Sequence, residues 1–115
     1  MRLIKRLLIA LVIVVILAIA AFVVWANTPP TPMPEAMQAL QTDTLVTVET
    51  DAWITFAPND VTATTGFIFY PGGRVDVRSY APPLRQIAEQ GFLVVAVPMP
   101  LNLAFFGQNN ADAVI

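Results

Sequence analysis

The chain contains no cysteine and no histidine, and beyond residue 26 it contains no lysine either. The lack of cysteine excludes disulfides and thiolate metal sites, and the lack of histidine removes the commonest metal ligand and general base. Carboxylates such as Glu49 and Asp51 remain, but both lie among polar turn residues, where we expect solvent to surround them. We therefore expect no metal ion and no cofactor.

Serine is almost absent, with Ser79 the only one in the chain. A hydroxyl nucleophile needs an adjacent base, usually His or Lys, and residues 27–115 contain neither. Ser79 stands just before a predicted helix, where a serine typically caps the first turn. The chain as it stands cannot complete a hydrolytic site.

Positive charge is scarce after the first residues. Residues 27–115 carry three arginines and eight acidic residues, a net charge of about −5. Nucleic-acid binding needs a basic surface, so this balance argues against a nucleic-acid partner. It also argues against a basic face for anionic lipids in this part of the chain.

Charge is missing altogether between Arg6 and Glu35. Leu7–Ala26 is an unbroken apolar run of 20 residues, long enough as a helix to span roughly 30 Å of hydrocarbon. The basic residues Arg2, Lys5 and Arg6 precede it, which predicts a cytoplasmic N-terminus and an extracytoplasmic remainder. We expect a single-pass signal anchor in the cell membrane over residues 1–26, with the lipid bilayer as the partner of residues 7–26.

A cleavable signal peptide is the alternative reading of the same run. Ala18–Ala20 and Val24–Ala26 both offer small residues to a signal peptidase. The apolar stretch is longer than the roughly 7–15 residues usual for such a peptide, which favours the anchor. In both readings the remainder is exported.

Residues 27–44 form a proline-rich linker, with four prolines between Pro29 and Pro34. Such a run favours the extended polyproline II conformation and predicts a semi-rigid spacer. A PxxP recognition motif is an alternative reading. Glu35–Gln41 is compatible with a short helical turn.

Residues 45–115 have the pattern of an α/β domain. Apolar and polar residues alternate over Val46–Glu49 and within Trp53–Ala57, which predicts a pair of strands. Gly66–Tyr70 and Phe92–Val97 are continuous apolar runs, the pattern of strands buried on both faces. Between them, a helix is predicted to begin within Ser79–Pro83.

Several residues set the limits of these elements. The pair Pro82–Pro83 restricts the helix start, because proline is tolerated only in the first turn. Gly91 is suited to end the helix, and Asp112–Ile115 resembles the first turn of another. Strand, glycine loop, helix and strand make a βαβ unit of a parallel sheet.

Pro71-Gly72-Gly73 is the one motif with a chemical rationale. Two glycines directly after a buried strand allow a tight turn and leave backbone N–H groups bare at its carboxyl end. In open α/β sheets, that edge is where ligands bind. An ordinary Pro-Gly-Gly turn is an equal alternative for the motif taken alone.

The ordered series of motifs over about residues 45–115 resembles the N-terminal half of an α/β-hydrolase family, most closely membrane-anchored bacterial members of its dienelactone-hydrolase-like branch. The segments that carry the resemblance are Phe69-Tyr70-Pro71-Gly72-Gly73-Arg74-Val75-Asp76, Tyr80-Ala81-Pro82, Gly91-Phe92-Leu93-Val94-Val95 and Pro98-Met99-Pro100-Leu101-Asn102-Leu103-Ala104. The resemblance implies that 66–70 is the third strand, 80–90 helix A and 92–97 the fourth strand.

The resemblance also implies a role for the glycine loop. Pro71–Gly73 matches the His-Gly-Gly type oxyanion loop, in which one backbone N–H helps to hold the tetrahedral oxyanion. Gly73 is the best match for that donor and Gly72 for its conformational support, while Pro71 replaces the usual His. Arg74, Asp76 and Arg78 are expected to form a solvated loop, and Met99–Phe106 core and cleft wall.

The family's nucleophile elbow G-x-S-x-G, acid and His follow the fourth strand, and none of them occurs in this sequence. We therefore expect an incomplete α/β-hydrolase fold, consisting of a strand pair and a βαβ unit of a mainly parallel sheet. The expected function is the N-terminal part of a membrane-anchored serine hydrolase for small-molecule esters, with the elbow roughly 10–25 residues beyond Ile115.

Two other classes of protein stay open. One is a non-enzymatic, membrane-anchored binding module with a small α/β domain. The other is a nucleotide-binding α/β domain, which ranks last because the chain lacks G-x-G-x-x-G and a P-loop lysine. The codons that follow Ile115 would discriminate among the three.

Overall fold

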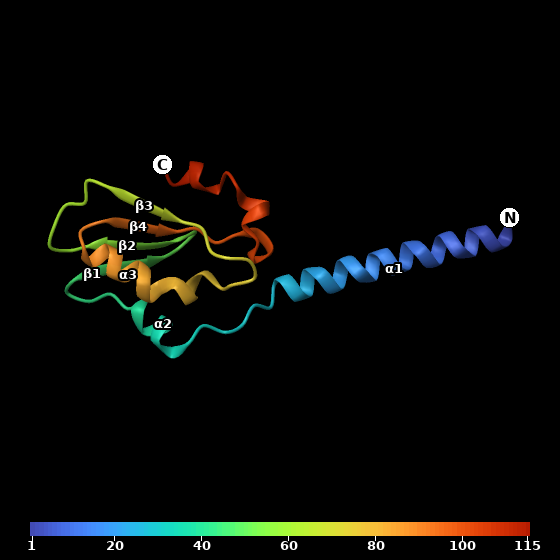
Figure 1. Cartoon of the computed structure of the whole chain (residues 1–115), viewed down its shortest axis with the longest axis horizontal. Helices are drawn as coiled ribbons and strands as arrows, with labels where there is room; N and C mark the ends of the chain where they lie inside the picture. Colours follow the sequence, from blue (N-terminus) through green and yellow to red (C-terminus); the bar gives the residue numbers. More distant parts are fainter.

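The computed structural model describes all residues 1–115 and consists of one long helix and a small α/β domain (Figure 1). Helix α1, Arg2–Ala26, projects from one end of the domain, and the whole chain measures 74 × 30 × 18 Å. Its side chains are exposed along almost its full length. By length and composition α1 can cross a membrane, a property that an N-terminal signal sequence shares.

The proline-rich segment after α1 does not separate the helix from the domain as a spacer would. Pro30, Thr31 and Met33 instead line a cavity together with residues of the domain. The segment leads into α2, Pro34–Ala39, which starts with its proline in the first turn and packs against the domain. The helical turn predicted within residues 35–41 is thus confirmed.

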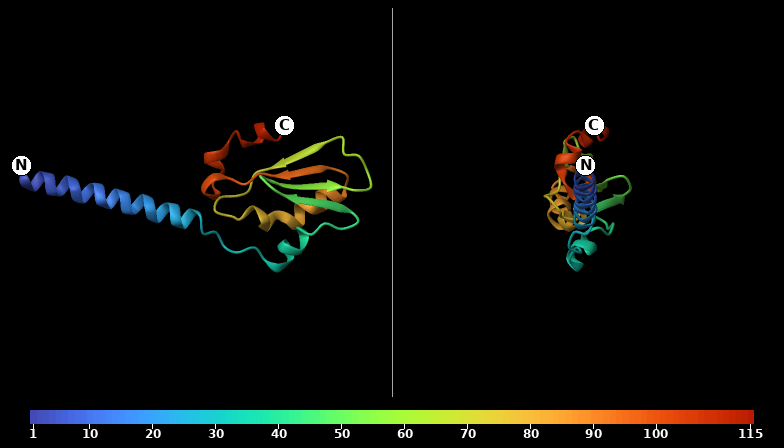
Figure 2. Two further views of the ribbon diagram at one scale, coloured as in Figure 1. Left: turned by 180° about the vertical axis from the view of Figure 1, so that it is seen from behind. Right: turned by 90° about the vertical axis from the view of Figure 1, so that its right-hand side faces the viewer.

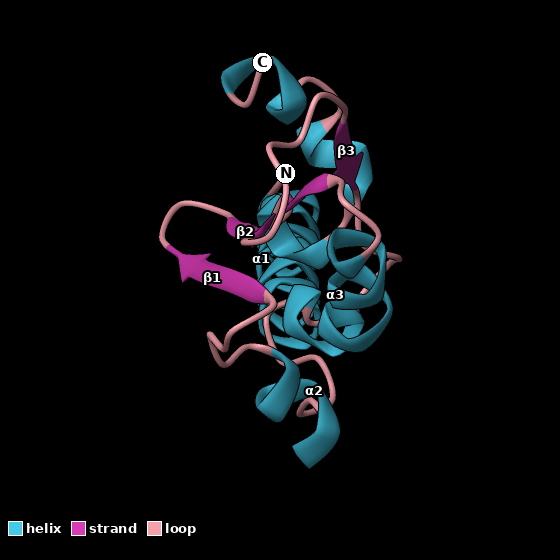
Figure 3. Ribbon diagram, turned by 90° about the vertical axis from the view of Figure 1, so that its left-hand side faces the viewer, coloured by secondary structure: helices cyan, strands magenta, loops and turns pink.

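Four strands form one mixed sheet in the order β1-β2-β4-β3, and Figure 3 distinguishes them from the helices. The strands are β1 Val46–Thr50, β2 Ile54–Pro58, β3 Gly66–Phe69 and β4 Leu93–Ala96. The predicted strand pair β1–β2 is an antiparallel hairpin, and β3 pairs with β4 in parallel. The sheet is mixed rather than mainly parallel, because β2 pairs antiparallel with β4.

Helix α3, Ala81–Glu89, connects β3 to β4 as predicted and lies over the sheet (Figures 1 and 2). A short 3₁₀ helix, Val77–Tyr80, precedes it. The prediction that Ser79 caps α3 is wrong, because Ser79 lies inside that 3₁₀ helix, which Asp76 caps by accepting from Arg78 N–H. The residue that directly precedes α3 is Tyr80, and its side chain makes no capping bond. Gly91 ends the helix as predicted, with φ at +98°, a conformation that suits glycine.

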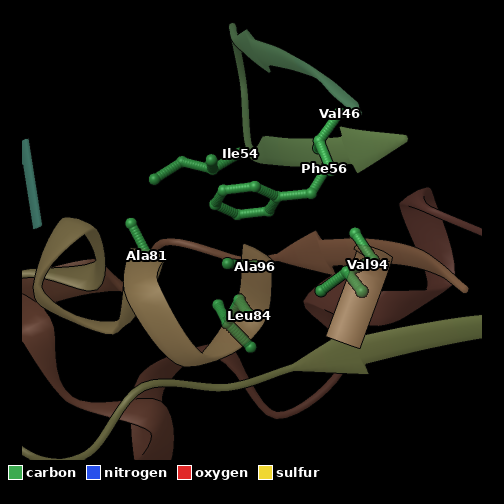
Figure 4. Close-up of a cluster of buried hydrophobic side chains, with 8 residues drawn as sticks. Val46, Ile54, Phe56, Ala81, Leu84, Val94 and Ala96 are labelled. Atoms are coloured by element: carbon green, nitrogen blue, oxygen red, sulfur yellow. The ribbon is translucent and has the colours of Figure 1, made fainter. Parts of the chain in front are cut away.

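The main core lies between α3 and one face of the sheet, as Figure 4 shows. Phe56 and Val94 are fully buried at its centre, and Leu84 reaches them from α3. The eight buried members of this core are Val46, Ile54, Phe56, Ala81, Leu84, Ala88, Val94 and Ala96. Alternate residues of β4 point to the other face, where Val95, Val97 and Met99 form a smaller cluster.

Strand β3 is not buried on both faces, contrary to the prediction from its continuous apolar run. Phe67 is 40% exposed and Ile68 36% exposed. The physical reason is that β3 is an edge strand with a neighbour, β4, on only one side. Residues of β3 and β4 line a shallow groove at this edge of the sheet. From the last turns of the chain, only Val114 and Ile115 contribute to its lining.

The chain after β4 forms three short 3₁₀ helices, Pro100–Asn102, Ala104–Gly107 and Asn110–Ala113. The last of these occupies the place where a first α-helical turn was expected. Tyr70 ties this segment to the end of β3, since its hydroxyl donates to Gln108 O and accepts from Ala111 N–H. Met99 is buried, as expected of core, whereas Phe105 and Phe106 are exposed.

Arg85 joins α3 to the start of the sheet. Its guanidinium pairs with Asp43 and donates to two carbonyls after α2, those of Ala39 and Gln41. Asp43 in turn accepts the N–H groups of Val46 and Leu45, and these bonds, with the Arg85 charge, hold the pKa of its carboxyl below the ordinary 3.8. One carboxylate therefore fixes the entry to β1.

Acid is expected to weaken the domain partly through Asp43. Because its pKa is lower in the folded than in the unfolded chain, ionised Asp43 stabilises the fold above the unfolded value, and this contribution is lost as the pH falls through the folded value. The substitution Asp43→Asn should therefore reduce the fall in Tm below about pH 4. Thermal unfolding of the full chain in detergent, followed by circular dichroism, measures this.

The matched control is Asp51→Asn, at an exposed carboxylate in the β1–β2 turn that forms no ion pair. Its acid profile should follow that of the unmodified chain. Equal flattening in both variants would contradict a specific role for Asp43.

Candidate functional site

Gly72 and Gly73 lie at the carboxyl end of β3, directly after the buried Pro71. Both glycines are exposed, so the loop they form faces open space at the edge of the sheet. Ligands of open α/β sheets bind at such carboxyl ends. The position of the predicted loop is therefore compatible with a binding site.

The two glycines differ in what their backbone N–H groups do. Gly72 N–H donates to the Tyr80 hydroxyl at 3.1 Å, and the Tyr80 ring packs against Phe69 with 4.7 Å between centroids. A Cβ at Gly72 would lie 2.8 Å from that hydroxyl, so the close approach needs glycine. Tyr80 thereby holds the loop against the end of β3.

Gly73 N–H, in contrast, donates to no acceptor within the protein. A Cβ built at Gly73 would lie 3.6 Å from Leu103 Cδ2, which is an ordinary contact, so glycine is not sterically required there. Neither glycine has a positive φ. What distinguishes Gly73 is thus an unpaired backbone donor on an exposed residue rather than an unusual backbone.

The left-handed turn of the loop falls on Arg74, at φ 53°. Its N–H donates to Asn102 O at 2.7 Å, and Asn102 and Leu101 also have positive φ, at 51° and 54°. Such conformations are strained for residues with a Cβ. Two strained segments therefore meet through one backbone hydrogen bond beside the glycines.

Arg74 was expected to be solvated, and this is wrong. Its Nε donates to Trp25 O and its Nη2 to Thr28 O, both at 2.9 Å. The guanidinium also lies over the Trp25 ring, 4.7 Å from the centroid, in a cation–π contact. Asn102 Nδ2 adds a bond to Ala26 O at 2.9 Å. The loop next to Gly73 is thus bound to the end of α1.

Asp76 and Arg78 form an ion pair with each other, and their side chains form no hydrogen bond with the glycine loop. Hydrogen bonds from the Arg78 side chain, and also from its backbone N–H, lower the pKa of Asp76, and the carboxylate in turn raises the pKa of Arg78. Arg78 is exposed. Both groups therefore stay charged, and their mutual bonds hold the start of the 3₁₀ helix.

Ser79 lines a cavity of about 300 Å³ between the proline-rich segment and the 74–82 loop, and Glu35 lies in the same wall. No side chain forms a hydrogen bond with the Ser79 hydroxyl. The carboxylates Glu49 and Asp51 are exposed, and no group of three acidic side chains gathers to hold a metal ion. The structure brings no base to the serine.

Sequence reasoning missed two residues of this region. Tyr80 belonged to a motif of the resemblance but had no role, and its ring spacing from Phe69 is a tertiary contact. Asn102 was regarded as cleft wall, yet it joins Arg74 to α1. No local signal pointed to the role of Tyr80, and the only signal for Asn102 was an asparagine in an uncharged segment.

Comparisons with known proteins bear on the second half of the chain. No curated protein and no solved structure matches the chain. The family model described as "Alpha/beta hydrolase family" matches residues 66–115, from the first residue of β3 through α3 and β4 to the last turns. The hairpin β1–β2 lies outside the match. This match supports the assignment of residues 66–115, with the glycine loop among them, to the alpha/beta hydrolase superfamily.

Proposed function

We propose that residues 66–115 supply the oxyanion loop of a serine hydrolase that acts on small-molecule esters. One observation carries the proposal, namely that Gly73, an exposed residue at the carboxyl end of β3, has a backbone N–H that is bonded to no acceptor in the protein. It lies within the segment that matches the hydrolase family. The dienelactone-hydrolase-like branch is part of the same proposal and rests on the motif resemblance alone.

Ester hydrolysis passes through a tetrahedral intermediate whose oxygen carries negative charge. In the α/β-hydrolase arrangement, an amide of the loop after the third strand and the amide after the nucleophile donate to that oxygen. Gly73 offers such a donor, and Gly72 supports it because its own N–H is already bonded to Tyr80. A donor held in place before the reaction stabilises the transition state without later reorganisation.

The catalytic triad of the proposed enzyme must come from residues outside this sequence. Ser79 is the only serine, and no histidine is present. In this fold the nucleophile, the acid and the histidine follow one another after the fourth strand. The 115 residues therefore contribute the oxyanion loop and the membrane attachment, and the remainder contributes the nucleophile.

Membrane attachment is the second part of the proposal. Helix α1 is long and apolar enough to span a bilayer, and the basic residues before Leu7 favour a cytoplasmic N-terminus. The domain then lies on the extracytoplasmic side as a single-pass protein of the cell membrane.

Removing the Gly73 N–H is expected to lower kcat in the hydrolase that contains this segment and a nucleophile elbow. Gly73→Pro deletes the donor, and loss of one oxyanion donor typically costs about a hundredfold or more in kcat. Gly73→Ala is the matched control, since it keeps the N–H and its Cβ meets only an ordinary contact with Leu103. Steady-state hydrolysis of p-nitrophenyl esters measures both variants.

The expected result is a large loss for the proline variant and a small one for the alanine variant. Unchanged kcat in a folded Gly73→Pro protein would remove Gly73 from the site. Equal losses in both variants would indicate a steric rather than a hydrogen-bonding role.

The 115-residue chain by itself is expected not to react with a fluorophosphonate probe. No side chain forms a hydrogen bond with the Ser79 hydroxyl, and the chain has no histidine to take its proton, so this hydroxyl is unactivated. In-gel fluorescence after labelling measures this, with Ser79→Ala as the control. Labelling that disappears in the alanine variant would contradict the claim that the nucleophile lies elsewhere.

Membrane attachment predicts that the expressed chain stays in the membrane pellet after an alkaline carbonate wash. A tag placed after Ile115 should be cut by protease added from the extracytoplasmic side. Immunoblotting of the pellet and supernatant measures both results. Recovery of a soluble form that begins near Asn27 would favour a cleaved signal peptide instead.

A further inference from the structure

The end of α1 and the loop end of the domain form one junction. Arg74 binds the carbonyls of Trp25 and Thr28, and Asn102 binds the carbonyl of Ala26. Ala26 is fully buried there, although the rest of α1 is exposed. These contacts come from two loops of the domain, so they fix which of its surfaces lies next to the point where α1 ends.

The segment that follows Asn102 carries two exposed aromatic rings. Phe105 is 76% exposed and Phe106 51% exposed, and the two rings contact each other edge to face at 5.5 Å. Figures 1 and 2 show this orange-red segment at the end of the domain beside the C-terminal end of α1. Large apolar side chains exposed together at one place mark a contact surface.

We propose that Phe105 and Phe106 insert into the interfacial layer of the bilayer that α1 spans, as a second membrane contact. The inference rests on the proposed membrane span of α1. With α1 across the bilayer, Trp25 lies at the headgroup level, where indole rings are favoured. The segment bonded to Ala26 then lies at the same level, and its exposed rings face lipid.

The charge pattern agrees with a lipid neighbour. No charged residue occurs between Glu89 and Asp112, so the whole segment around the two rings is uncharged. Membrane-surface segments bury phenylalanine at the boundary between headgroups and acyl chains, and an ionised group in this layer would oppose that burial. Because the domain is acidic, contact through this uncharged segment also avoids repulsion by anionic lipid.

A nitroxide-quenching experiment on the full chain in vesicles tests the contact. Since the chain has no cysteine, one introduced cysteine can be labelled with the fluorophore NBD at a single position. The test position is Phe105→Cys, in phosphatidylcholine vesicles whose lipids carry a nitroxide near the top of the acyl chain. The position Ile13→Cys, in the middle of α1, reports whether the helix is in the bilayer.

The matched control is Phe92→Cys, at a ring 40% exposed that precedes β4 at the opposite end of the sheet. We expect severalfold stronger quenching at position 105 than at position 92, with clear protection of position 13 from aqueous quencher. Equal, weak quenching at 105 and 92 with position 13 in the bilayer would overturn the inference and leave the anchor intact.

Two further outcomes also count against the contact. A blue-shifted emission at position 105 without quenching by nitroxide lipid would identify a protein neighbour, such as a second copy, in place of lipid. Access of aqueous quencher to position 13 would overturn the membrane span itself, and the inference with it. The test position is a surface side chain, so its replacement leaves the core unchanged.

Discussion

The last four carbonyls of an α-helix have no partners within the helix, and in α1 every one of them is bonded from outside. Asn27 and Thr28, just past the end, donate to the carbonyls of Val23, Val24 and Trp25. The domain adds a further donor to Trp25 O and supplies the donor to Ala26 O. The bonds are Asn27 Nδ2 to Val23 O, Thr28 Oγ1 to Val24 O, Arg74 Nε to Trp25 O and Asn102 Nδ2 to Ala26 O. The last carbonyl of the helix, that of Ala26, therefore has a partner within the protein only when the domain is folded against the helix.

This requirement explains the strained backbone around the candidate site. Arg74, Leu101 and Asn102 all have left-handed φ values, each of which costs roughly 1–2 kcal/mol for a residue with a Cβ. Arg74 is held by three hydrogen bonds and by Trp25, and Asn102 by the bonds to Arg74 and Ala26. Strain at both loops is thus offset by contacts with α1, and the loop that carries Gly73 takes its shape from them.

Periodicity predicted the elements of the domain well, because apolar alternation, paired prolines and Gly91 act locally. The hairpin, α3 and β4 lie where their residues placed them. The burial of β3 was not predictable in this way, because it depends on which neighbours a strand has rather than on its own residues. The same apolar pattern gives a β4 that is buried from Val94 onward, between β2 and β3, and a half-open β3 at the edge. The first two residues of the predicted 92–97 run, Phe92 and Leu93, are exposed, so that prediction holds only in part.

The sequence predicted where the candidate site lies, but not which residues surround and hold it. Gly72 and Gly73 follow β3 as the motif implied, yet the left-handed residue of the turn is Arg74 rather than a glycine. The partners that shape the loop lie far away in sequence, with Arg74 bonded to residues 46 and 49 positions earlier and Asn102 to a residue 76 positions earlier. No local pattern encodes such pairs, and neither arginine nor asparagine is distinctive by itself.

Because no free stalk separates α1 from the domain, the motion of the domain relative to the membrane is restricted. A domain on a flexible tether takes up many orientations and heights above the membrane. Each productive collision must then select one of them, at a cost in entropy. Here Arg74 and Asn102 hold the domain directly against the end of α1. If α1 is anchored, the domain moves only by sliding and spinning within the plane of the membrane. Its loop end would then stay at a constant height above the lipid surface.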